Sequence, residues 1–404
     1  MLSEESAATV RATLPVLAES LDAITARFYD TMFADRPELL DGLFNRANQA
    51  NGEQRRALAG AIAAFASALV ERPEERPDAL LSRIAHKHVS LGITEDQYVV
   101  VHKYLFGAIA HELGDAATPD VVAAWDEVYW LMAGALIAQE ARLYARAGVG
   151  EEVRSPWRRW AVTERRSETD DVLSLTLRPD DGAPVPEVRP GQYVSVCTRL
   201  PDGVHQARQY SVSHSDSERI RITVKRVDAT AAEPAGEVST RLHTDAGIGD
   251  VLSVSIPAGD VTPGSGDRPL VLVSAGIGCT PMVGMLNALA DGSSTRQVLL
   301  LHADRSPEAH PLREETEGLV GRLPRARSVV WYEDGGSAEH RQGRMDLSET
   351  ELPEDPEVYM CGPLPFMRDV RTQLLRAGVP ARSIHYEVFG PDLWLPDGAP
   401  ASSA

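Results

Sequence analysis

Residues 269–281 read PLVLVSAGIGCTP, an apolar run that passes directly into a glycine turn. A short buried strand that ends in G-x-G is typical of a parallel sheet at the edge where nucleotides bind. Thr280 as the N-cap and Pro281 as the first helical residue would start a helix whose amide groups face a pyrophosphate. The pattern is shorter than the full G-x-G-x-x-G fingerprint, so an ordinary strand-to-helix turn is the alternative. The candidate nucleotide contacts are Gly276, Ile277, Gly278, Cys279, Thr280 and Pro281.

Apolar runs and amphipathic segments alternate from this stretch onward. The apolar runs predict strands at residues 269–274, 297–302, 328–332 and 358–361, and the amphipathic segments predict helices at residues 282–289, 311–323 and 366–377. Strands that alternate with helices are the signature of a doubly wound parallel sheet. We expect this α/β domain to occupy residues 266–391.

Cys361, Gly362 and Pro363 form a second candidate nucleotide turn at the end of the last predicted strand. A small thiol before a rigid turn leaves room for a flat nicotinamide ring, although a tight turn with a buried core cysteine has the same pattern. In the first turn, Cys279 could add sensitivity to oxidation or could simply fill space.

The choice of coenzyme stays open in the sequence. The nucleotide's ribose would lie after the second strand of the sheet, where Asp304 and Arg305 stand. Asp304 would suit the free ribose hydroxyl of NADH, and Arg305 would suit the 2′-phosphate of NADPH.

A different pattern precedes the parallel sheet. Short runs rich in Val, Ile, Thr and Tyr predict strands at residues 171–178, 192–198, 209–214, 219–227 and 251–256, with one helical insert at residues 238–244. Several short strands separated by Gly and Pro turns predict a small antiparallel β-barrel, which we place at residues 148–265.

This barrel carries residues suited to a flavin dinucleotide. An aromatic side chain can lie on the flavin ring, an arginine can bind pyrophosphate through two hydrogen bonds, and a Gly/Ser helix start offers further amide groups to phosphate. The candidates are Tyr193, Arg208, Gln209, Tyr210, Ser211, Gly236, Val238 and Ser239. Any one of them alone could be surface loop chemistry.

Together and in this order, the motifs resemble the ferredoxin-NADP reductase family. In that family a flavin barrel with R-x-Y-S precedes a nicotinamide domain with G-x-G-x-T-P and C-G-P. The resemblance covers roughly residues 155–391. It implies one FAD, with NADH or NADPH as the electron donor.

The first third of the chain reads as helix after helix, with apolar residues at three- and four-residue spacing. Proline and glycine mark the breaks, Thr94 and Gln97 look like a capping box, and the last helix, residues 120–147, is long. We therefore expect an all-α domain at residues 1–147.

Two histidines in this region, His86 and His88, compete as metal ligands. On a helix, His88 shares its face with Leu81, Ile84 and Leu91, whereas His86 falls on the opposite side. This predicts that His88 is buried and that His86 is solvated. A single neutral imidazole is what a haem iron requires on its proximal side, although a hydrogen-bonded core histidine is the commoner use of such a residue.

An eight-helix-like layout with one such histidine is typical of a globin. A globin joined to a flavin reductase resembles the flavohaemoglobin family, and the match runs from the first helix to Pro391. The resemblance implies one haem b with His88 as its proximal ligand. It also implies that Tyr29 donates a hydrogen bond to the oxygen ligand, that Phe44 packs on the porphyrin, and that Gln54 and Leu58 lie above the iron.

The same resemblance assigns further roles. Tyr98 and Glu140 would couple to the proximal histidine and make the iron more electron-rich. Lys87 and Glu387 would lie between haem and flavin and tune electron transfer. The last implied flavin contacts are Val388, Phe389, Gly390 and Pro391.

The activity that the resemblance implies is that of a nitric oxide dioxygenase. Electrons would pass from NAD(P)H through FAD to haem, and nitric oxide and O₂ would become nitrate, which detoxifies nitric oxide. One alternative is a sensor or store for O₂ or nitric oxide that keeps its own iron reduced. Another is a flavin reductase for peroxides, quinones or ferric iron.

Composition excludes several other classes. With 40 Lys and Arg against 59 Asp and Glu, the chain offers no basic face for nucleic acid. No apolar run reaches the ~20 residues that span a bilayer. An acidic N-terminus without an apolar core and three widely separated cysteines point to a reducing cytoplasm. We expect a cytoplasmic monomer whose residues 392–404 form a loose tail.

Overall fold

A computed structural model describes residues 2–41, 44, 53–74, 77–149, 155–230 and 234–390. The chain divides into two compact units. The helical unit contains residues 1–156, 201–207 and 390–404, and the reductase unit contains residues 157–200 and 208–389. The proposed tail, residues 392–404, lies outside the described residues.

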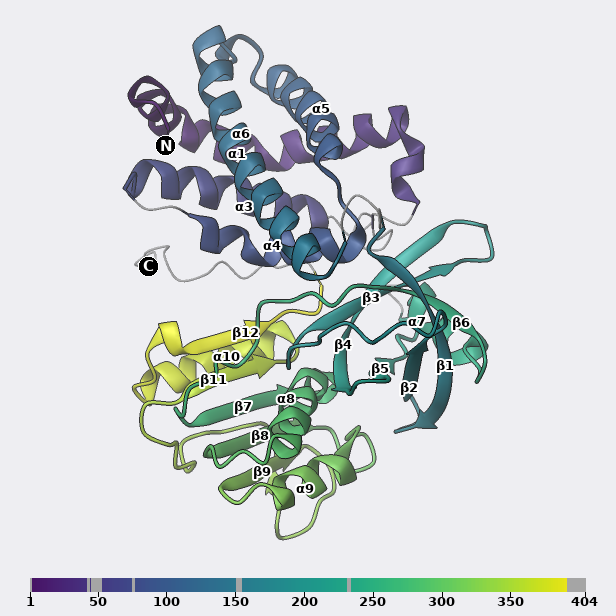
Figure 1. The fold of residues 1–404 in the computed structure, drawn as a ribbon. Coiled ribbons are helices and arrows are strands. Elements are labelled where there is room, and N and C mark those ends of the chain that lie inside the picture. Colours follow the sequence, from purple (N-terminus) through teal and green to yellow (C-terminus); the bar gives the residue numbers. More distant parts are fainter. Residues whose placement is uncertain are drawn as a thin grey trace. The chain divides into compact units, whose positions relative to one another are not determined.

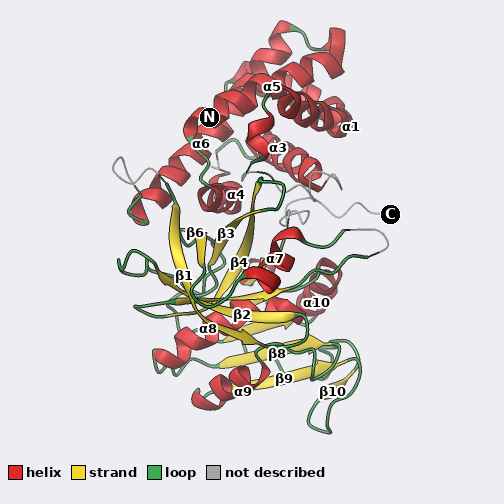
Figure 2. Cartoon of the chain, turned by 90° about the vertical axis from the view of Figure 1, so that its right-hand side faces the viewer, coloured by secondary structure: helices red, strands yellow, loops and turns green. Residues whose placement is uncertain are grey.

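Between residues 2 and 149, the described part of the helical unit contains helices and no strand (Figures 1 and 2), as predicted. Its elements are α1 (Glu4–Asp35), η1 (Pro37–Leu40), α3 (Glu53–Glu71), α4 (Asp78–Leu91), α5 (Glu95–Leu113), η2 (Gly114–Ala116) and α6 (Pro119–Arg146). The predicted capping box is present, because Thr94 and Gln97 exchange side-chain and backbone hydrogen bonds at the start of α5. Gly92 ends α4 in the left-handed conformation, with φ of 82°.

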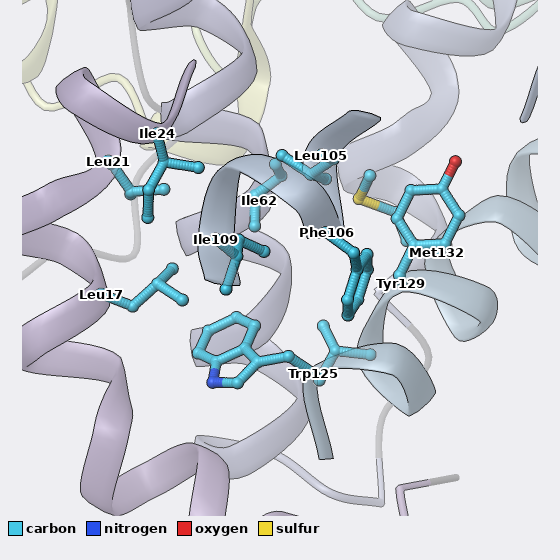
Figure 3. Close-up of a pocket in the computed structure, with 11 residues that line it drawn as sticks. Leu17, Leu21, Ile24, Ile62, Leu105, Phe106, Ile109, Trp125, Tyr129 and Met132 are labelled. Atoms are coloured by element: carbon cyan, nitrogen blue, oxygen red, sulfur yellow. The ribbon is translucent and has the colours of Figure 1, made fainter. Parts of the chain in front are cut away.

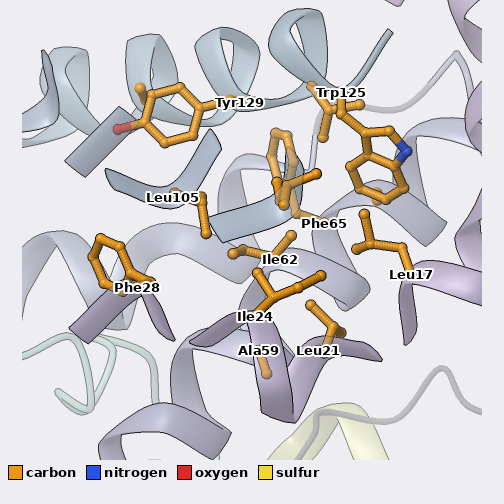
Figure 4. Close-up of a cluster of buried hydrophobic side chains, with 14 of the residues drawn as sticks. Leu17, Leu21, Ile24, Phe28, Ala59, Ile62, Phe65, Leu105, Trp125 and Tyr129 are labelled. Carbon is orange, nitrogen blue, oxygen red and sulfur yellow. The ribbon is translucent and has the colours of Figure 1, made fainter. Parts of the chain in front are cut away.

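The core of the helical unit lies where α1 crosses α3, α5 and α6. Leu17, Ile24, Phe28, Phe65 and Trp125 are among its buried side chains (Figure 4). Burial of each such side chain stabilises the fold by about 1.5–3 kcal/mol. Among the described residues, α6 alone is long and apolar enough to cross a membrane. It contacts α1, α4 and α5 and contributes to this core, as the central helix of a globular domain does.

The first part of the reductase unit is a closed antiparallel barrel with the strand order β1-β2-β5-β4-β3-β6. Its elements are β1 (Trp157–Ser167), β2 (Val172–Pro179), β3 (Tyr193–Arg199), β4 (His205–Ser215), β5 (Ile220–Lys225), α7 (Glu237–Asp245) and β6 (Val251–Ser255). The sequence pattern did not predict β1, because its second half is charged and exposed and only Trp160 and Val162 are buried. Closure pairs both edges of this strand.

The second part of the reductase unit is a six-stranded parallel sheet with the order β10-β9-β8-β7-β11-β12 (Figure 1). Its elements are β7 (Leu270–Ala275), η3 (Gly276–Gly278), α8 (Cys279–Asp291), β8 (Val298–Asp304), α9 (Arg313–Arg322), β9 (Ala326–Tyr332), β10 (Arg341–Gln342), β11 (Glu357–Cys361), α10 (Leu364–Arg376), η4 (Ala381–Ser383) and β12 (Ile384–Glu387). The sequence missed β10, which has two residues, and β12, whose residues are mostly polar.

The strand order places a switch point beside β7. From β7 the chain moves outward through β8 and β9, and then returns to β11 on the other side of β7. Successive residues of β7 from Leu270 to Val273 are all fully buried, so both faces of the sheet are covered. Ligands of doubly wound sheets bind at the carboxyl ends of the strands at this switch point, which is where both predicted nucleotide turns lie.

Candidate functional site

The two predicted nucleotide turns meet at the switch point. Gly278 lies so close to the end of β11 that a Cβ atom there would be 2.4 Å from the carbonyl oxygen of Cys361 and 2.9 Å from the nitrogen of Gly362. Gly276 has a φ of +53°, in the left-handed region that favours glycine. Both glycines are therefore needed to bring the turn after β7 against the turn after β11.

The helix after the first turn begins two residues earlier than predicted. Gly278 is the N-cap of α8, and Cys279 is its first residue. Thr280 is not the N-cap, because its hydroxyl donates to the carbonyl of Ile277 at 3.0 Å. Pro281 is still tolerated, since the first helical turn needs few of its own amide donors. The positive end of α8 still points at the turn.

The thiols of both turns are buried. Cys361 is fully buried and Cys279 is 3% exposed. Burial raises the pKa of each thiol well above its usual range, which keeps both protonated. Cys279 lies in the apolar core under α8 and α9, and its thiol donates to the carbonyl of Pro311. Two roles were considered for Cys279, and its burial favours a space-filling core residue over an oxidation-sensitive thiol.

The two candidate determinants of coenzyme choice differ in exposure. The side chain of Asp304 is only 6% exposed, and its Oδ2 lies 3.4 Å from Nε2 of His302. The side chain of Arg305 is 67% exposed and lies 4.0 Å from Asp171. Arg305 is thus accessible to a ribose phosphate, whereas the carboxylate of Asp304 is turned into the protein.

A buried polar row beside the nucleotide turns was not predicted. The Ser274 hydroxyl lies 2.9 Å from His302 Nδ1, and the rings of His302 and His310 stack at 3.9 Å. His310 Nδ1 in turn lies 2.9 Å from the hydroxyl of Tyr332. Burial lowers the pKa of His310 to about 2, so this ring is neutral. The row links the carboxyl ends of β7, β8 and β9, and no sequence motif marks it.

Strand β4 carries the predicted flavin motif, and its residues fit a flavin. Ser211 Oγ is buried and has no hydrogen-bond partner among the described residues. Buried hydroxyls are rarely left unsatisfied, so this group is suited to the edge of a bound ring. The pKa of Arg208 is lowered, mainly by burial. The nearby Tyr210 and Glu237 act in the opposite direction but do not outweigh burial. A largely buried guanidinium is a suitable partner for pyrophosphate.

The other predicted flavin residues surround this strand. Gln209 donates to the Ser195 hydroxyl at 3.1 Å. Tyr193 is buried on β3 against Gly259. Gly236 is the N-cap of α7, and Ser239 accepts a bond from the Val227 amide at 3.2 Å and donates to the carbonyl of Gly236. The next residue of the set, Val238, is buried in the barrel core.

The C-terminal candidates follow β12. Glu387 is 8% exposed and lies opposite Cys361 in the sheet register. Val388 is half-buried, Phe389 is 49% exposed, and Gly390 has a φ of +137°. Pro391 lies outside the described residues. Lys87 belongs to the helical unit and Glu387 to the reductase unit, so their pairing stays a prediction.

In the helical unit, three helices bring His88, Tyr98 and Glu140 together. His88 Nδ1 lies 2.8 Å from Glu140 Oε1 and 3.0 Å from the Tyr98 hydroxyl. The Tyr98 hydroxyl donates to the same carboxylate oxygen at 2.5 Å. Because Glu140 accepts from both groups, His88 carries its ring proton on Nδ1. Its Nε2 then presents a lone pair, as an iron ligand requires.

The burial predicted for the two histidines is wrong. His86 is buried, at 7% exposed, whereas the His88 side chain is 29% exposed. The buried face of α4 is formed by Leu81, Ala85 and Val89, and His86 adjoins it. The contacts of His88 with Tyr98 on α5 and Glu140 on α6, and not a place on the apolar face of α4, therefore make it the candidate iron ligand.

Four aromatic rings gather around Tyr29, which the resemblance assigns to the haem site. The Tyr29 ring is buried on α1 and lies 4.7, 5.6 and 6.0 Å from those of Phe28, Phe33 and Phe44. Leu58, on α3, packs against the same apolar core. Gln54 lies in α3, but its side chain is outside the described residues.

The helical unit also holds an apolar pocket between α1, α3, α5 and α6 (Figure 3). Tyr129 is in its wall and donates its hydroxyl to the backbone carbonyl of Tyr98 at 2.6 Å. The pocket is lined by Leu17, Leu21, Ile24, Ile62, Leu105, Phe106, Ile109, Trp125, Val128, Tyr129 and Met132. Such walls suit small apolar molecules and offer no acid–base chemistry.

One short segment from the barrel side of the chain packs within the helical unit. Gln206, which is fully buried, donates to the carbonyl of Phe44 at 3.1 Å, and the His205 amide donates to Asp41 at 2.6 Å. These residues immediately precede the flavin motif on β4. Sequence reasoning missed them because nothing in their local pattern indicates a partner some 160 residues away.

The fold and these sites define an oxidoreductase in which a globin is joined to a flavin- and nicotinamide-binding reductase. Three family models match: Globin at residues 26–136, Oxidoreductase FAD-binding domain at residues 159–262 and Oxidoreductase NAD-binding domain at residues 272–372. The chain is 42% identical to the flavohemoprotein of Bordetella parapertussis, covering 96% of this chain and 99% of the relative. It is 36% identical to that of Bacillus subtilis, covering 98% and 99%. The chain belongs to the flavohemoprotein family.

Solved structures agree with this assignment. The flavohemoglobin of Malassezia yamatoensis, determined with bound FAD and heme, matches 96% of this chain and 100% of its own, with a TM-score of 0.89 and 40% identity. The FAD/NAD-binding domain of a nitric oxide dioxygenase from Vibrio cholerae matches 58% of this chain and 99% of its own, with a TM-score of 0.55 and 39% identity. The resemblance inferred from the motifs is confirmed, and so are the cofactor classes haem, FAD and nicotinamide dinucleotide.

Proposed function

We propose that this protein is a nitric oxide dioxygenase, which converts nitric oxide and O₂ to nitrate with electrons from NADH or NADPH. The observation that carries the proposal is the joint contact of His88, Tyr98 and Glu140, in one chain with the two nucleotide turns and the flavin motif. The name of the Vibrio cholerae relative supports it. When bound, FAD converts a two-electron donor into single electrons, and haem supplies the site for O₂.

The proximal residues would hold haem through His88 Nε2. Glu140 accepts a hydrogen bond from the Nδ1–H group of His88, which fixes the ring and would make the imidazole a stronger donor to iron. Burial and the neighbouring Glu140 raise the pKa of Tyr98 well above its usual range, so Tyr98 stays protonated and holds the carboxylate in place. These residues would favour an electron-rich iron.

On the opposite side of the site, Tyr29 would donate a hydrogen bond to bound O₂. Phe44 and Leu58 would exclude water, and Gln54 would lie nearby. In the reductase unit, Tyr193 and Arg208–Ser211, together with Gly236, Val238, Ser239, Val388 and Phe389, would hold FAD. Gly390 and Pro391, which follow that unit in the chain, would add to the same site. The two nucleotide turns would hold the coenzyme, and Lys87 and Glu387 would tune electron transfer to haem.

Nitric oxide should accelerate aerobic NADH or NADPH oxidation and be recovered as nitrate. Two nitric oxide molecules should be consumed per coenzyme, because each hydride carries two electrons and each turnover uses one. Little acceleration and no nitrate would instead favour a sensor or store, or a reductase of peroxides, quinones or ferric iron. Comparison of kcat/KM with NADH and with NADPH shows which coenzyme the protein prefers.

Replacement of Tyr29 by phenylalanine should slow nitric oxide consumption about 10- to 100-fold, since a hydrogen bond to a charged group contributes about 1.5–3 kcal/mol. NADH reduction of an artificial acceptor such as ferricyanide should be unchanged. Tyr104→Phe is a matched control, because its hydroxyl contacts Asp35 rather than the aromatic group around Tyr29. Equal nitric oxide consumption by all three proteins would remove Tyr29 from the mechanism.

We further propose the division into residues 1–147, 148–265 and 266–391, with a tail at residues 392–404. The proposed setting is the cytoplasm, and the proposed form is a monomer. Size-exclusion chromatography with light scattering tests the last point.

A further inference from the structure

Helix α8 rests with its backbone on strand β4. A Cβ atom at Gly284 would lie 2.4 Å from the carbonyl oxygen of Val212, and ordinary contact begins at 3.4 Å. Gly284 is one helical turn from Thr280, in the nicotinamide turn, and Val212 follows Ser211 of the flavin motif. This contact therefore joins the helix that follows the nicotinamide turn to the strand that carries the flavin motif, and Figure 1 shows α8 beside the barrel strands.

Polar contacts hold the same two elements together. Asn287, one turn further along α8 and 7% exposed, donates to the carbonyl of Ser213 at 3.1 Å and to Glu315 Oε1 at 3.0 Å. Arg221 on β5 binds both oxygens of Glu315 at 2.7 Å and donates from Nε to the hydroxyl of Ser213 at 2.9 Å. The fork of Arg221 gives this contact a fixed geometry.

The ion pair is largely shielded from water. The side chains of Arg221 and Glu315 are 15% and 20% exposed. Burial alone would raise the pKa of Glu315, but Arg221 and Asn287 lower it, so the carboxylate is ionised at neutral pH. Loss of one partner would leave a buried charge unpaired, which makes the pair unfavourable to break.

The barrel side of this contact is itself anchored. The Ser213 hydroxyl lies 3.1 Å from that of Thr223, which lies 2.9 Å from the Ser174 hydroxyl. Ser174 in turn donates to Glu168 at 2.6 Å. Three strands, β2, β5 and β4, thus share one polar network, so β4 cannot shift alone under α8.

We propose that Gly284, Asn287, Arg221 and Glu315 form a clamp that fixes the nicotinamide turn relative to the flavin strand and thereby sets the distance of hydride transfer. The clamp residues are positioning residues, which act through α8 and β4 and not on the cofactors directly. A hydride, two electrons and one proton, leaves the reduced nicotinamide for FAD, which takes a further proton from water. The clamp rests on the reductase half of the proposed function alone.

Hydride transfer depends steeply on this distance. Reacting atoms must approach to about 3–3.5 Å, and a displacement of about 1 Å can cost 10²-fold in rate. A Cβ atom at Gly284 would have to move α8 away from Val212 by about 1 Å to reach ordinary contact. Gly284→Ala should therefore slow flavin reduction about 10²-fold.

The test uses the full-length protein loaded with haem and FAD and mixed anaerobically with NADH. The limiting rate of flavin reduction should fall, the long-wavelength charge-transfer absorbance between the two rings should weaken, and the Kd for NADH should stay within about twofold. Gly318→Ala, on α9, is the matched control, because a Cβ atom there meets nothing within 4 Å.

Asn287→Ala is the second variant, in case Gly284→Ala does not fold. It removes two bonds without a clash and should slow the same step about 3- to 10-fold. Flavin reduction within twofold of the parent rate in a variant that folds and retains FAD would overturn the clamp. Nitric oxide is absent from this assay. The test of the clamp is therefore independent of the test of dioxygenase activity, and either proposal can fail without the other.

Discussion

His88→Ala is expected to abolish the haem Soret band of the purified protein while flavin absorbance remains. His88 Nδ1 donates a hydrogen bond to Glu140, and its Nε2 is the atom that we propose as the iron ligand. Without it, the unit offers a globin fold but no proximal ligand at this position. Absorbance spectra and cofactor-to-protein ratios measure the effect.

The control for this prediction is His86→Ala. His86 is more deeply buried than His88, so its loss should lower the melting temperature, yet the Soret band should persist in the folded protein. Imidazole added to His88→Gly should restore a Soret band. Wild-type haem content in His88→Ala, or its loss in His86→Ala alone, would make the proximal assignment wrong.

Arg208→Ala should have the reciprocal effect, with loss of FAD and retention of haem. Charge-assisted hydrogen bonds contribute about 1.5–3 kcal/mol each, so loss of two bonds to pyrophosphate should weaken FAD binding by at least about 10²-fold. Fluorescence of FAD released on gel filtration measures this loss, and NADH should then no longer reduce the haem.

Arg178→Ala is the matched control for Arg208→Ala. Arg178 lies on barrel strand β2, which β5 separates from β4. It pairs with Glu218 at 2.6 Å, but its side chain is 55% exposed. Exposed pairs of this kind contribute about 0–1 kcal/mol, so FAD content should not change. Retention of stoichiometric FAD by Arg208→Ala would remove this arginine from the flavin site.

Much of the fold could be predicted from local sequence. Helical spacing, short alternating runs and buried strands between helices each extend over a whole domain, so isolated errors do not change the fold class. The two missed strands at the ends of the reductase unit show the limit. The charged and polar side chains of β1 and β12 do not show a strand pattern in the sequence. These segments are strands because neighbouring strands pair with them.

The nucleotide turns could also be predicted from local sequence. A strand, a glycine turn and a helix start follow one another directly in the chain, so spacing alone indicates their chemistry. The predicted start of α8 was wrong by two residues, because the Thr280 hydroxyl donates to the carbonyl three residues back instead of capping the helix. The residue type alone does not determine which of these two bonds forms.

Local sequence predicted the helical, barrel and parallel-sheet parts of the chain, the order of the cofactor motifs and His88 as the candidate haem ligand. The contacts that support the proposed role of His88 depend on the folded chain, because Tyr98 and Glu140 stand 10 and 52 residues away on other helices. Tertiary structure also decided that Cys279 is buried and that α8 rests on β4. Periodicity reports the environment within one element, whereas hydrogen-bond partners, burial and close backbone approach depend on elements that only the folded chain brings together.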